Sequence, residues 1–405
     1  MTQQVSQDNL PPTTAEASSA ALPSLPLSQR VAVAKSFEPV PFIPPLWARN
    51  QHIQTIFGSE SVRTRLFGRH SQWPFIDDLV RARVDTPDGD FIDMDFYYWD
   101  GDRAHELHRC VAEGRVEKPS TSDPLVLVLH GLESNSRSPL CLKMARAFHA
   151  RNFDVCLVNF RSCSGELPRT VRAYNVGFTE DLQFLVERFR HITPSRPLFL
   201  AGFSLGGNVI TKWLGSMGEE AYAVKGVRGA AVACVPFDPL AAQPKIDSPG
   251  FSRLVYTGNF LRTLKVKAET HHQRFPGSFN LDGVREAKTI GEFDRHFIAP
   301  IFGFADKKDY YMKSASKPHL PFIRTPYMAI NARDDPFVDD ESLPQERHVD
   351  HVAKQHTDDV GAPVRLVYTE KGGHCGFYMG KGGWSLAEEM GRFLGDVDRA
   401  HNGLL

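Results

Sequence analysis

The stretch PLFLAGFSLGGNVITKWL, residues 197–214, joins an apolar run to a segment with helical periodicity through Gly202-x-Ser204-x-Gly206. This pattern predicts a buried strand, a sharp turn and a helix, which is the context of a nucleophile elbow. A glycine on each side of Ser204 relieves the crowding of so tight a turn. A bare Gly-x-Ser-x-Gly also arises by chance, so the flanking strand and helix carry the prediction. Ser204 is expected at a helix N-terminus, whose dipole favours a developing negative charge.

Similar apolar runs recur along the chain, separated by stretches with helical periodicity. Besides residues 197–203, the runs are 124–130, 154–160, 229–237, 325–332 and 364–370. Near-continuous apolar strands that alternate with helices are typical of a mostly parallel sheet covered by helices on both faces. Residues 80–99 instead alternate on either side of a TPDGD turn and predict an antiparallel hairpin. The predicted fold class is α/β, with a mostly parallel central sheet and an antiparallel N-terminal entry.

A serine nucleophile needs a base and an acid, and folds with this elbow carry them in the chain order serine, acid, histidine. Asp334 and Asp335 follow the run 325–332, and His374 follows the run 364–370 between glycines and a cysteine. Parallel sheets place their ligands at the carboxyl ends of strands, where these residues fall. Two adjacent carboxylates cannot both face one imidazole. The following Pro-Phe-Val favours Asp335 as the acid, and Asp334 remains the alternative.

The oxyanion hole is expected from two backbone N–H groups, those of Leu132 and Leu205. Leu205 follows Ser204, and Leu132 lies in the His-Gly-Leu-Glu sequence that ends the run 124–130. His130 is interpreted as a structural residue that packs this loop, rather than as a base. Cys163 and Cys375 are the alternative nucleophiles, but neither lies on an elbow, which argues against both.

Two segments differ in character from the predicted sheet and its helices. Residues 1–35 are rich in Pro, Ser, Thr, Ala and Gln and contain no aromatic residue before Phe37, so a flexible tail is expected. Residues 241–320 are too long for a plain connection and are rich in Phe and Tyr. They are either a helical elaboration with a small core of its own or a cap over an active site. The remaining residues, 36–240 and 321–405, are expected to form the α/β core.

Composition excludes several classes of protein. The chain has 405 residues, with 47 Lys and Arg against 48 Asp and Glu, so it lacks the basic excess of most nucleic-acid binders. No apolar run reaches the roughly 18 residues of a membrane span, and the N-terminus has no signal-peptide pattern. Six scattered cysteines favour neither a zinc site nor a disulfide scaffold. A cytoplasmic protein without nucleic-acid partner or transmembrane segment is expected; peripheral membrane contact and oligomeric state stay open.

With these residues in place, the chain resembles the α/β-hydrolase superfamily, and within it the YheT-type branch with its bacterial hydrolases and yeast medium-chain ester synthase/esterases. The motifs that carry the resemblance are NQHIQT at 50–55, HGLE at 130–133, NFR at 159–161, CSGE at 163–166, GFSLGGN at 202–208, PFD at 236–238, FDRHFIAPIFGFADKKDYY at 293–311, NARDDPF at 331–337 and GGHCGF at 372–377. The resemblance implies an α/β-hydrolase fold with a helical cap. By motif position it implies a charge-relay triad of Ser204, Asp335 and His374.

The resemblance also implies hydrolysis of short- to medium-chain carboxylic esters, and in some members acyl transfer to an alcohol. No metal or organic cofactor is required for either reaction. Two positions depart from the family pattern, because Ser134 and Ser162 stand where glycine is usual. Serine is unfavourable there if the backbone has a positive φ, and the shape of the acyl or alcohol pocket is then expected to differ.

The sequence thus predicts a serine ester hydrolase with a small-molecule acyl ester as substrate and an acyl-enzyme on Ser204. Three alternatives remain: an acyltransferase that uses the same intermediate, a non-catalytic lipid- or partner-binding α/β protein, and a peptidase.

Overall fold

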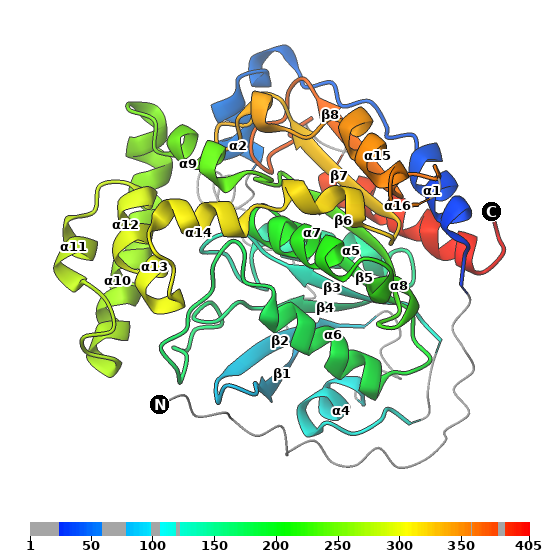
Figure 1. Cartoon of the computed structure of the whole chain (residues 1–405), viewed down its shortest axis with the longest axis horizontal. Helices are drawn as coiled ribbons and strands as arrows, with labels where there is room; N and C mark the ends of the chain where they lie inside the picture. The colour runs from blue at the N-terminus through cyan, green and yellow to red at the C-terminus, as the bar shows by residue number, and fades with distance from the viewer. Residues whose placement is uncertain (1–23, 59–77, 99–105, 119–121, 358, 380–384) are drawn as a thin grey trace.

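A computed structural model describes residues 24–58, 78–98, 106–118, 122–357, 359–379 and 385–405 of the chain. An α/β core with a cluster of helices at one side is seen in Figure 1. The first 23 residues of the expected tail lie outside the described residues.

A single eight-stranded sheet forms the centre of the molecule, in the order β1-β2-β4-β3-β5-β6-β7-β8. The strands are β1 (Val80–Asp85), β2 (Phe91–Tyr97), β3 (Leu125–Leu129), β4 (Asp154–Val158), β5 (Leu198–Phe203), β6 (Val227–Ala233), β7 (Tyr327–Ala332) and β8 (Val364–Thr369). β1 pairs antiparallel with β2, and β2 with β4, whereas all other neighbours are parallel. The predicted fold class and the N-terminal hairpin are confirmed.

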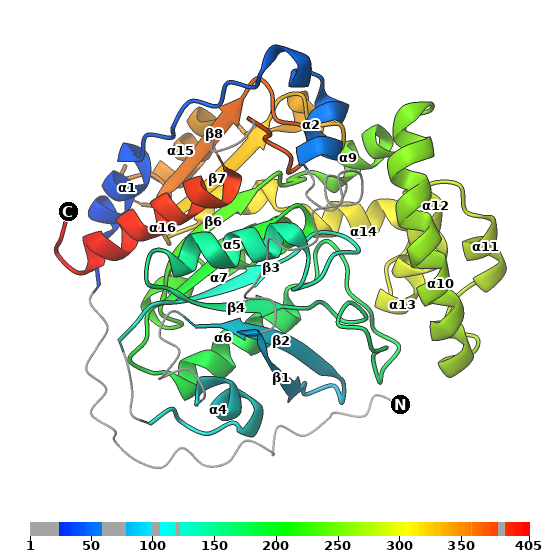
Figure 2. The ribbon, with the colours of Figure 1, turned by 180° about the vertical axis from the view of Figure 1, so that it is seen from behind.

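Helices cover both faces of this sheet. One face carries α4 (Leu107–Glu113), α6 (Glu180–Ile192), α7 (Leu205–Met217) and α8 (Glu219–Ala223), in front of the sheet in Figure 1. The other carries α5 (Pro139–His149) and α16 (Leu386–His401), in front in Figure 2. Shorter elements are the 3-10 turn Leu46–Ala48, α2 (Gln51–Gly58), the 3-10 turn Asp340–Ser342 and α15 (Glu346–Lys354).

The central strands are buried on both faces, which explains their near-continuous apolar sequences. In β3, Leu125, Leu127 and Leu129 pack into one hydrophobic core with residues of α6 and α7. Val126 and Val128 of the same strand pack into a second core with residues of α5 and α16. The alternation follows from the two-residue period of a strand.

The prediction of a flexible tail is wrong for residues 27–35, because they belong to the helix α1 (Leu27–Ser36). Ala34 is fully buried, and Arg30 is buried with its guanidinium paired to Glu219 at 2.9 Å and bonded to the carbonyl oxygen of Arg324 at 2.7 Å. These contacts lie about 190 and 290 residues away in the sequence, so local composition did not reveal them.

The connection between β6 and β7 is helical. Its elements are α9 (Pro239–Ile246), the π-helical turn η3 (Ser252–Thr257), α10 (Gly258–Arg274), α11 (Leu281–Glu286), α12 (Ile290–His296), α13 (Ile298–Phe302), α14 (Lys307–Ser314) and the 3-10 helix η4 (Lys317–Phe322). Its aromatic rings pack against one another, as Phe297 does with Phe279 and Phe293 at centroid distances of 4.7 and 5.1 Å. Most of these helices form the group at the left of Figure 1.

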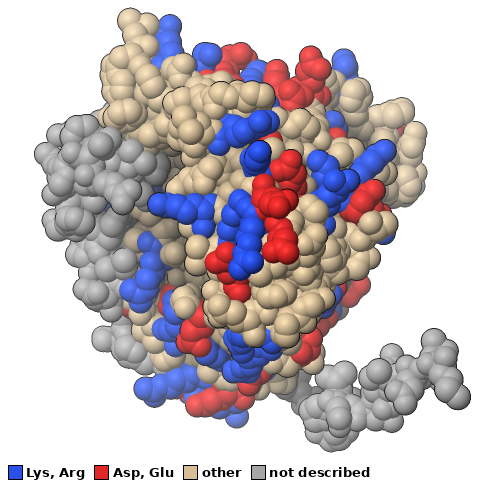
Figure 3. Space-filling view, turned by 90° about the vertical axis from the view of Figure 1, so that its left-hand side faces the viewer, with Lys and Arg blue, Asp and Glu red and all other residues tan. Residues whose placement is uncertain are grey.

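The face that lies toward the left of Figure 1 shows basic and acidic side chains next to one another (Figure 3). On α10 and α11, for example, Arg285 pairs with Glu269 at 3.2 Å and with Asp282 at 3.5 Å. Opposite charges therefore neighbour one another on the described part of this face.

Candidate active site

Ser204 lies in a strained turn between β5 and α7. Its φ is +53°, in the left-handed region that costs a residue with a side chain about 1–3 kcal/mol. Its N–H donates to the carbonyl oxygen of Ala233 at 2.8 Å. A Cβ atom at Gly206 would lie 2.4 Å from the carbonyl oxygen of Leu129, so glycine is required there for the turn to pack on β3. These contacts hold the serine above the carboxyl end of the sheet.

The loops after β7 and β8 bring an acid and an imidazole to this serine. His374 Nε2 lies 2.9 Å from Ser204 Oγ, and His374 Nδ1 lies 2.7 Å from Asp335 Oδ2. Asp335 is fully buried, and its Oδ1 accepts the Phe337 N–H at 2.7 Å. Because a carboxylate only accepts, Nδ1 carries the proton and Nε2 accepts from the serine hydroxyl. The structure thus brings Ser204, His374 and Asp335 into one hydrogen-bonded line.

The neighbouring carboxylate points elsewhere. Asp334 Oδ1 accepts the N–H of Gly373 at 3.0 Å, so this residue holds the backbone of the histidine loop. The N–H of His374 in turn donates to Thr55 Oγ1 of α2 at 2.9 Å. Between the two acids left open by the sequence, only Asp335 contacts the imidazole.

The electrostatic environment of His374 favours the imidazolium. Burial acts to lower the pKa of His374, but Asp335 and Cys375 together outweigh burial and raise it above its ordinary value. A positive charge that develops on this ring is therefore stabilised in place.

The residues that carry the two predicted oxyanion donors line the same cavity as Ser204. Leu132 and Leu205 both line it, and within the described residues the N–H of neither has a hydrogen-bond partner. His130 lies beneath this loop, fully buried, with Nδ1 2.7 Å from the Gly131 carbonyl oxygen. Burial lowers the pKa of His130 to about 4, so it is neutral and its place is structural.

Sequence reasoning missed the role of Glu133 in this loop. Glu133 has a φ of +54°, and its Oε1 accepts from the Tyr174 hydroxyl at 2.9 Å and from Lys267 Nζ at 2.7 Å. Lys267 lies on α10, so the ion pair ties the helical insertion to the loop that follows β3. The motif at 130–133 contains the glutamate, but its partners are far away in sequence and gave no signal.

The cavity above Ser204 has a volume of about 270 Å³ and is lined mostly by apolar groups. The insertion supplies much of its wall through Ile246, Phe260, Leu264, Ile290, Phe293, Phe297 and Ile298. Asp294 is an acidic exception, and the Tyr311 hydroxyl donates to it at 2.7 Å. Burial raises the pKa of Asp294 to about 7, so a large fraction of it is protonated near neutral pH.

The two departures from the family pattern differ in their conformation. Ser162 has a φ of +69°, where glycine is favoured. In the loop that contains Ser134, the residue with a positive φ is the preceding Glu133, and Ser134 itself does not have one. The expected cost of a serine therefore applies to Ser162, which also lines the cavity.

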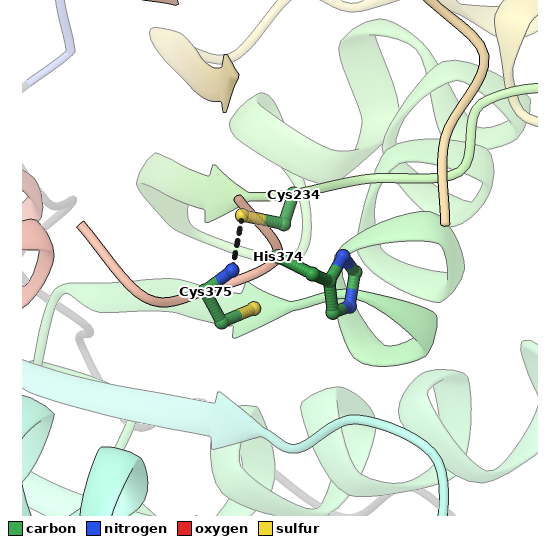
Figure 4. A group of neighbouring side chains, drawn as sticks. All are labelled: Cys234, His374 and Cys375. Carbon is green, nitrogen blue, oxygen red and sulfur yellow. Dashed lines mark hydrogen bonds between the residues drawn. The ribbon is translucent and has the colours of Figure 1, made fainter. Parts of the chain in front are cut away.

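A group of three potential metal-binding side chains adjoins the site. One donor atom each of Cys234, His374 and Cys375 lies within 4.8 Å of the others (Figure 4). Both imidazole nitrogens are already bonded, to Asp335 and to Ser204. A metal ion there would have to displace one of them, so the group does not fit a resident metal.

Among the described helices, none is long and apolar enough to cross a membrane.

Comparisons with known proteins point to one family. Residues 124–380 match the family described as alpha/beta hydrolase fold. The chain is 31% identical to the Escherichia coli protein named "Putative esterase YheT", over 84% of this chain and 87% of that protein. It is 28% identical to human phospholipase ABHD3, over 73% and 66%. It is 27% identical to medium-chain fatty acid ethyl ester synthase/esterase 2 of Saccharomyces cerevisiae, over 53% and 52%.

Proposed function

The chain belongs to the alpha/beta hydrolase fold family, and from this premise we propose that it is a serine carboxylic-ester hydrolase that acts through an acyl-enzyme on Ser204. The observation that carries the proposal is the hydrogen-bonded line from Ser204 through His374 to the buried Asp335. The esterases among its relatives support the same reaction class.

In the first half of the reaction, Ser204 Oγ attacks the ester carbonyl while His374 Nε2 accepts its proton. Asp335 keeps the ring in the productive tautomer and stabilises its positive charge. The N–H groups of Leu132 and Leu205 bind the oxyanion, each such donor typically contributing about 10²–10³ in rate. The alcohol then leaves with the proton from His374.

In the second half, His374 activates a water molecule that hydrolyses the acyl-enzyme. An alcohol in place of water would give acyl transfer. This second candidate is favoured by one observation, the similarity to a yeast protein named as both ester synthase and esterase. The product ratio in the presence of ethanol separates the two, because hydrolysis alone yields no ethyl ester.

The substrate proposed is an ester with a short- to medium-length acyl chain. The apolar wall of the cavity suits an acyl chain, and its volume of about 270 Å³ sets a limit on length. We propose residues 241–320 as the cap over this cavity and residues 36–240 with 321–405 as the core. Two rivals to this proposal remain. A non-catalytic lipid- or partner-binding protein would not need Ser204 for its function. A peptidase would need Ser204 but would release an amine in place of an alcohol.

The test is intact-mass measurement after incubation with a fluorophosphonate, for the natural chain and for Ser204→Ala. One adduct on the natural chain and none on the variant supports an activated Ser204. A folded natural chain without adduct would contradict the proposal and favour the binding protein. A series of esters of increasing acyl length, beside the anilide of the best acyl group, then gives the chain-length optimum and tests the peptidase.

A further inference from the structure

Two thiols of the site have no part in the proposed reaction. Cys234 follows β6 directly, and Cys375 follows His374. Their sulfur atoms lie within 4.8 Å of each other, and the N–H of Cys375 donates to Cys234 Sγ at 3.1 Å (Figure 4). This hydrogen bond holds the two cysteines next to each other.

Both cysteines have a strained backbone. Their φ angles are +53° at Cys234 and +58° at Cys375, each costing about 1–2 kcal/mol for a residue with a side chain. In an extended segment, neighbouring side chains point to opposite sides. The left-handed turn instead places the Cys375 sulfur near both the His374 ring and Cys234 (Figure 4). Strain of this kind is retained where the surrounding structure requires the conformation.

The two thiols differ in access and in charge. Cys375 is partly exposed and lines the cavity, whereas Cys234 is fully buried behind it. A side-chain hydrogen bond with Cys234 lowers the pKa of the Cys375 thiol to about 6, and positive charge on the adjacent His374 ring adds to this effect. Burial instead raises the pKa of Cys234 well above its ordinary value. A nucleophilic thiolate next to a second thiol is the arrangement found in redox-sensitive cysteines.

We propose that Cys375 and Cys234 form an oxidation site for hydroperoxides. The Cys375 thiolate attacks the peroxide and breaks its O–O bond, which gives a sulfenic acid on Cys375 and, after protonation, water or an alcohol. The Cys234 thiol then attacks the Cys375 sulfur, and the sulfenic hydroxyl leaves as a second water. The two sulfurs are together oxidised by two electrons, and the peroxide is reduced by two.

Formation of the bond disturbs the neighbouring imidazole. The sulfurs must approach from within 4.8 Å to about 2.0 Å, so at least one of the two cysteine side chains has to leave its present position. His374 adjoins Cys375, and its bonds of 2.9 Å to Ser204 and 2.7 Å to Asp335 depend on the position of the loop that carries both residues. Oxidation is therefore expected to switch off the esterase, and this consequence rests on the proposed function.

The experiment treats the full chain with hydrogen peroxide in the presence of a chelator, then maps its peptides without reduction. Esterase activity and fluorophosphonate labelling of Ser204 are measured before and after, and again after dithiothreitol. Cys234→Ala removes the second thiol. Cys163→Ser is the matched control, because Cys163 is a buried cysteine near the cavity whose pKa is raised to about 11 by burial.

The expected result is a peptide linked through Cys234 and Cys375, a loss of activity of about 10²-fold or more, and recovery with dithiothreitol. Cys163→Ser behaves in the same way, whereas Cys234→Ala forms no linked peptide and recovers less activity. The proposal is overturned if the natural chain is labelled normally before oxidation but yields no linked peptide. It is also overturned if Cys234→Ala recovers as much esterase activity after dithiothreitol as the natural chain does. Absence of labelling before oxidation would instead count against the proposed function, and the linked peptide would still test the pair.

Discussion

Replacing Asp335 by Asn tests which hydrogen bond the activity depends on. In the protein, Asp335 Oδ1 accepts the Phe337 N–H, and Oδ2 faces His374 Nδ1. An asparagine that keeps the first bond presents its NH₂ group to the ring. Nδ1 must then accept, so the proton moves to Nε2, which no longer accepts from Ser204. The substitution leaves the side-chain volume almost unchanged and reverses the direction of the hydrogen bond between residue 335 and His374 Nδ1.

The expected loss in kcat/KM is about 10³–10⁴-fold, which equals about 4–5.5 kcal/mol of transition-state stabilisation. The assay follows hydrolysis of a chromogenic short-chain ester, with unfolding in urea as the check that Asp335→Asn is folded. KM is expected to change little, because the substrate does not contact this carboxylate.

The matched control is Asp334→Asn. Its Oδ1 accepts the Gly373 N–H, and the amide oxygen of Asn preserves that bond. A loss of no more than about threefold, or about 0.7 kcal/mol, is expected, because the bond that holds the histidine loop is kept. Similar losses in the two variants, or a larger loss at Asp334, would refute the reasoning.

Three further predictions follow from contacts near the cavity. Ser162→Gly relieves a φ of +69° and is expected to raise the free energy of unfolding by about 0.5–1 kcal/mol in urea titrations; a lowered value would contradict the strain at this position. Lys267→Met leaves the buried Glu133 carboxylate with one fewer partner, so the free energy of unfolding is expected to fall by about 1–3 kcal/mol and to recover when Glu133→Gln is added; no recovery would contradict the ion pair. Asp294 has a pKa raised to about 7, so the folded state binds more protons than the unfolded state between about pH 4 and 7. The stability of the natural chain is therefore expected to fall by up to about 4 kcal/mol across that window, relative to Asp294→Asn, and parallel curves for the two proteins would refute this.

Much of the fold and of the candidate site was predictable because its signals are local. Near-continuous apolar runs predict buried parallel strands, and Gly202 and Gly206 around Ser204 predict the elbow, since both depend on nearby residues only. Asp335 and His374 were predictable because the carboxyl ends of parallel strands meet at one edge of the sheet.

The remaining features depend on contacts between distant segments, and only the tertiary structure decided them. Burial of Arg30 beside Glu219 makes a helix of a segment whose composition indicates a tail. The ion pair between Glu133 and Lys267 joins residues 134 positions apart, and the contact between Cys234 and Cys375 joins residues 141 positions apart. Composition and periodicity describe neighbours along the chain, whereas an ion pair or a thiol pair exists only after the sheet has brought its loops together.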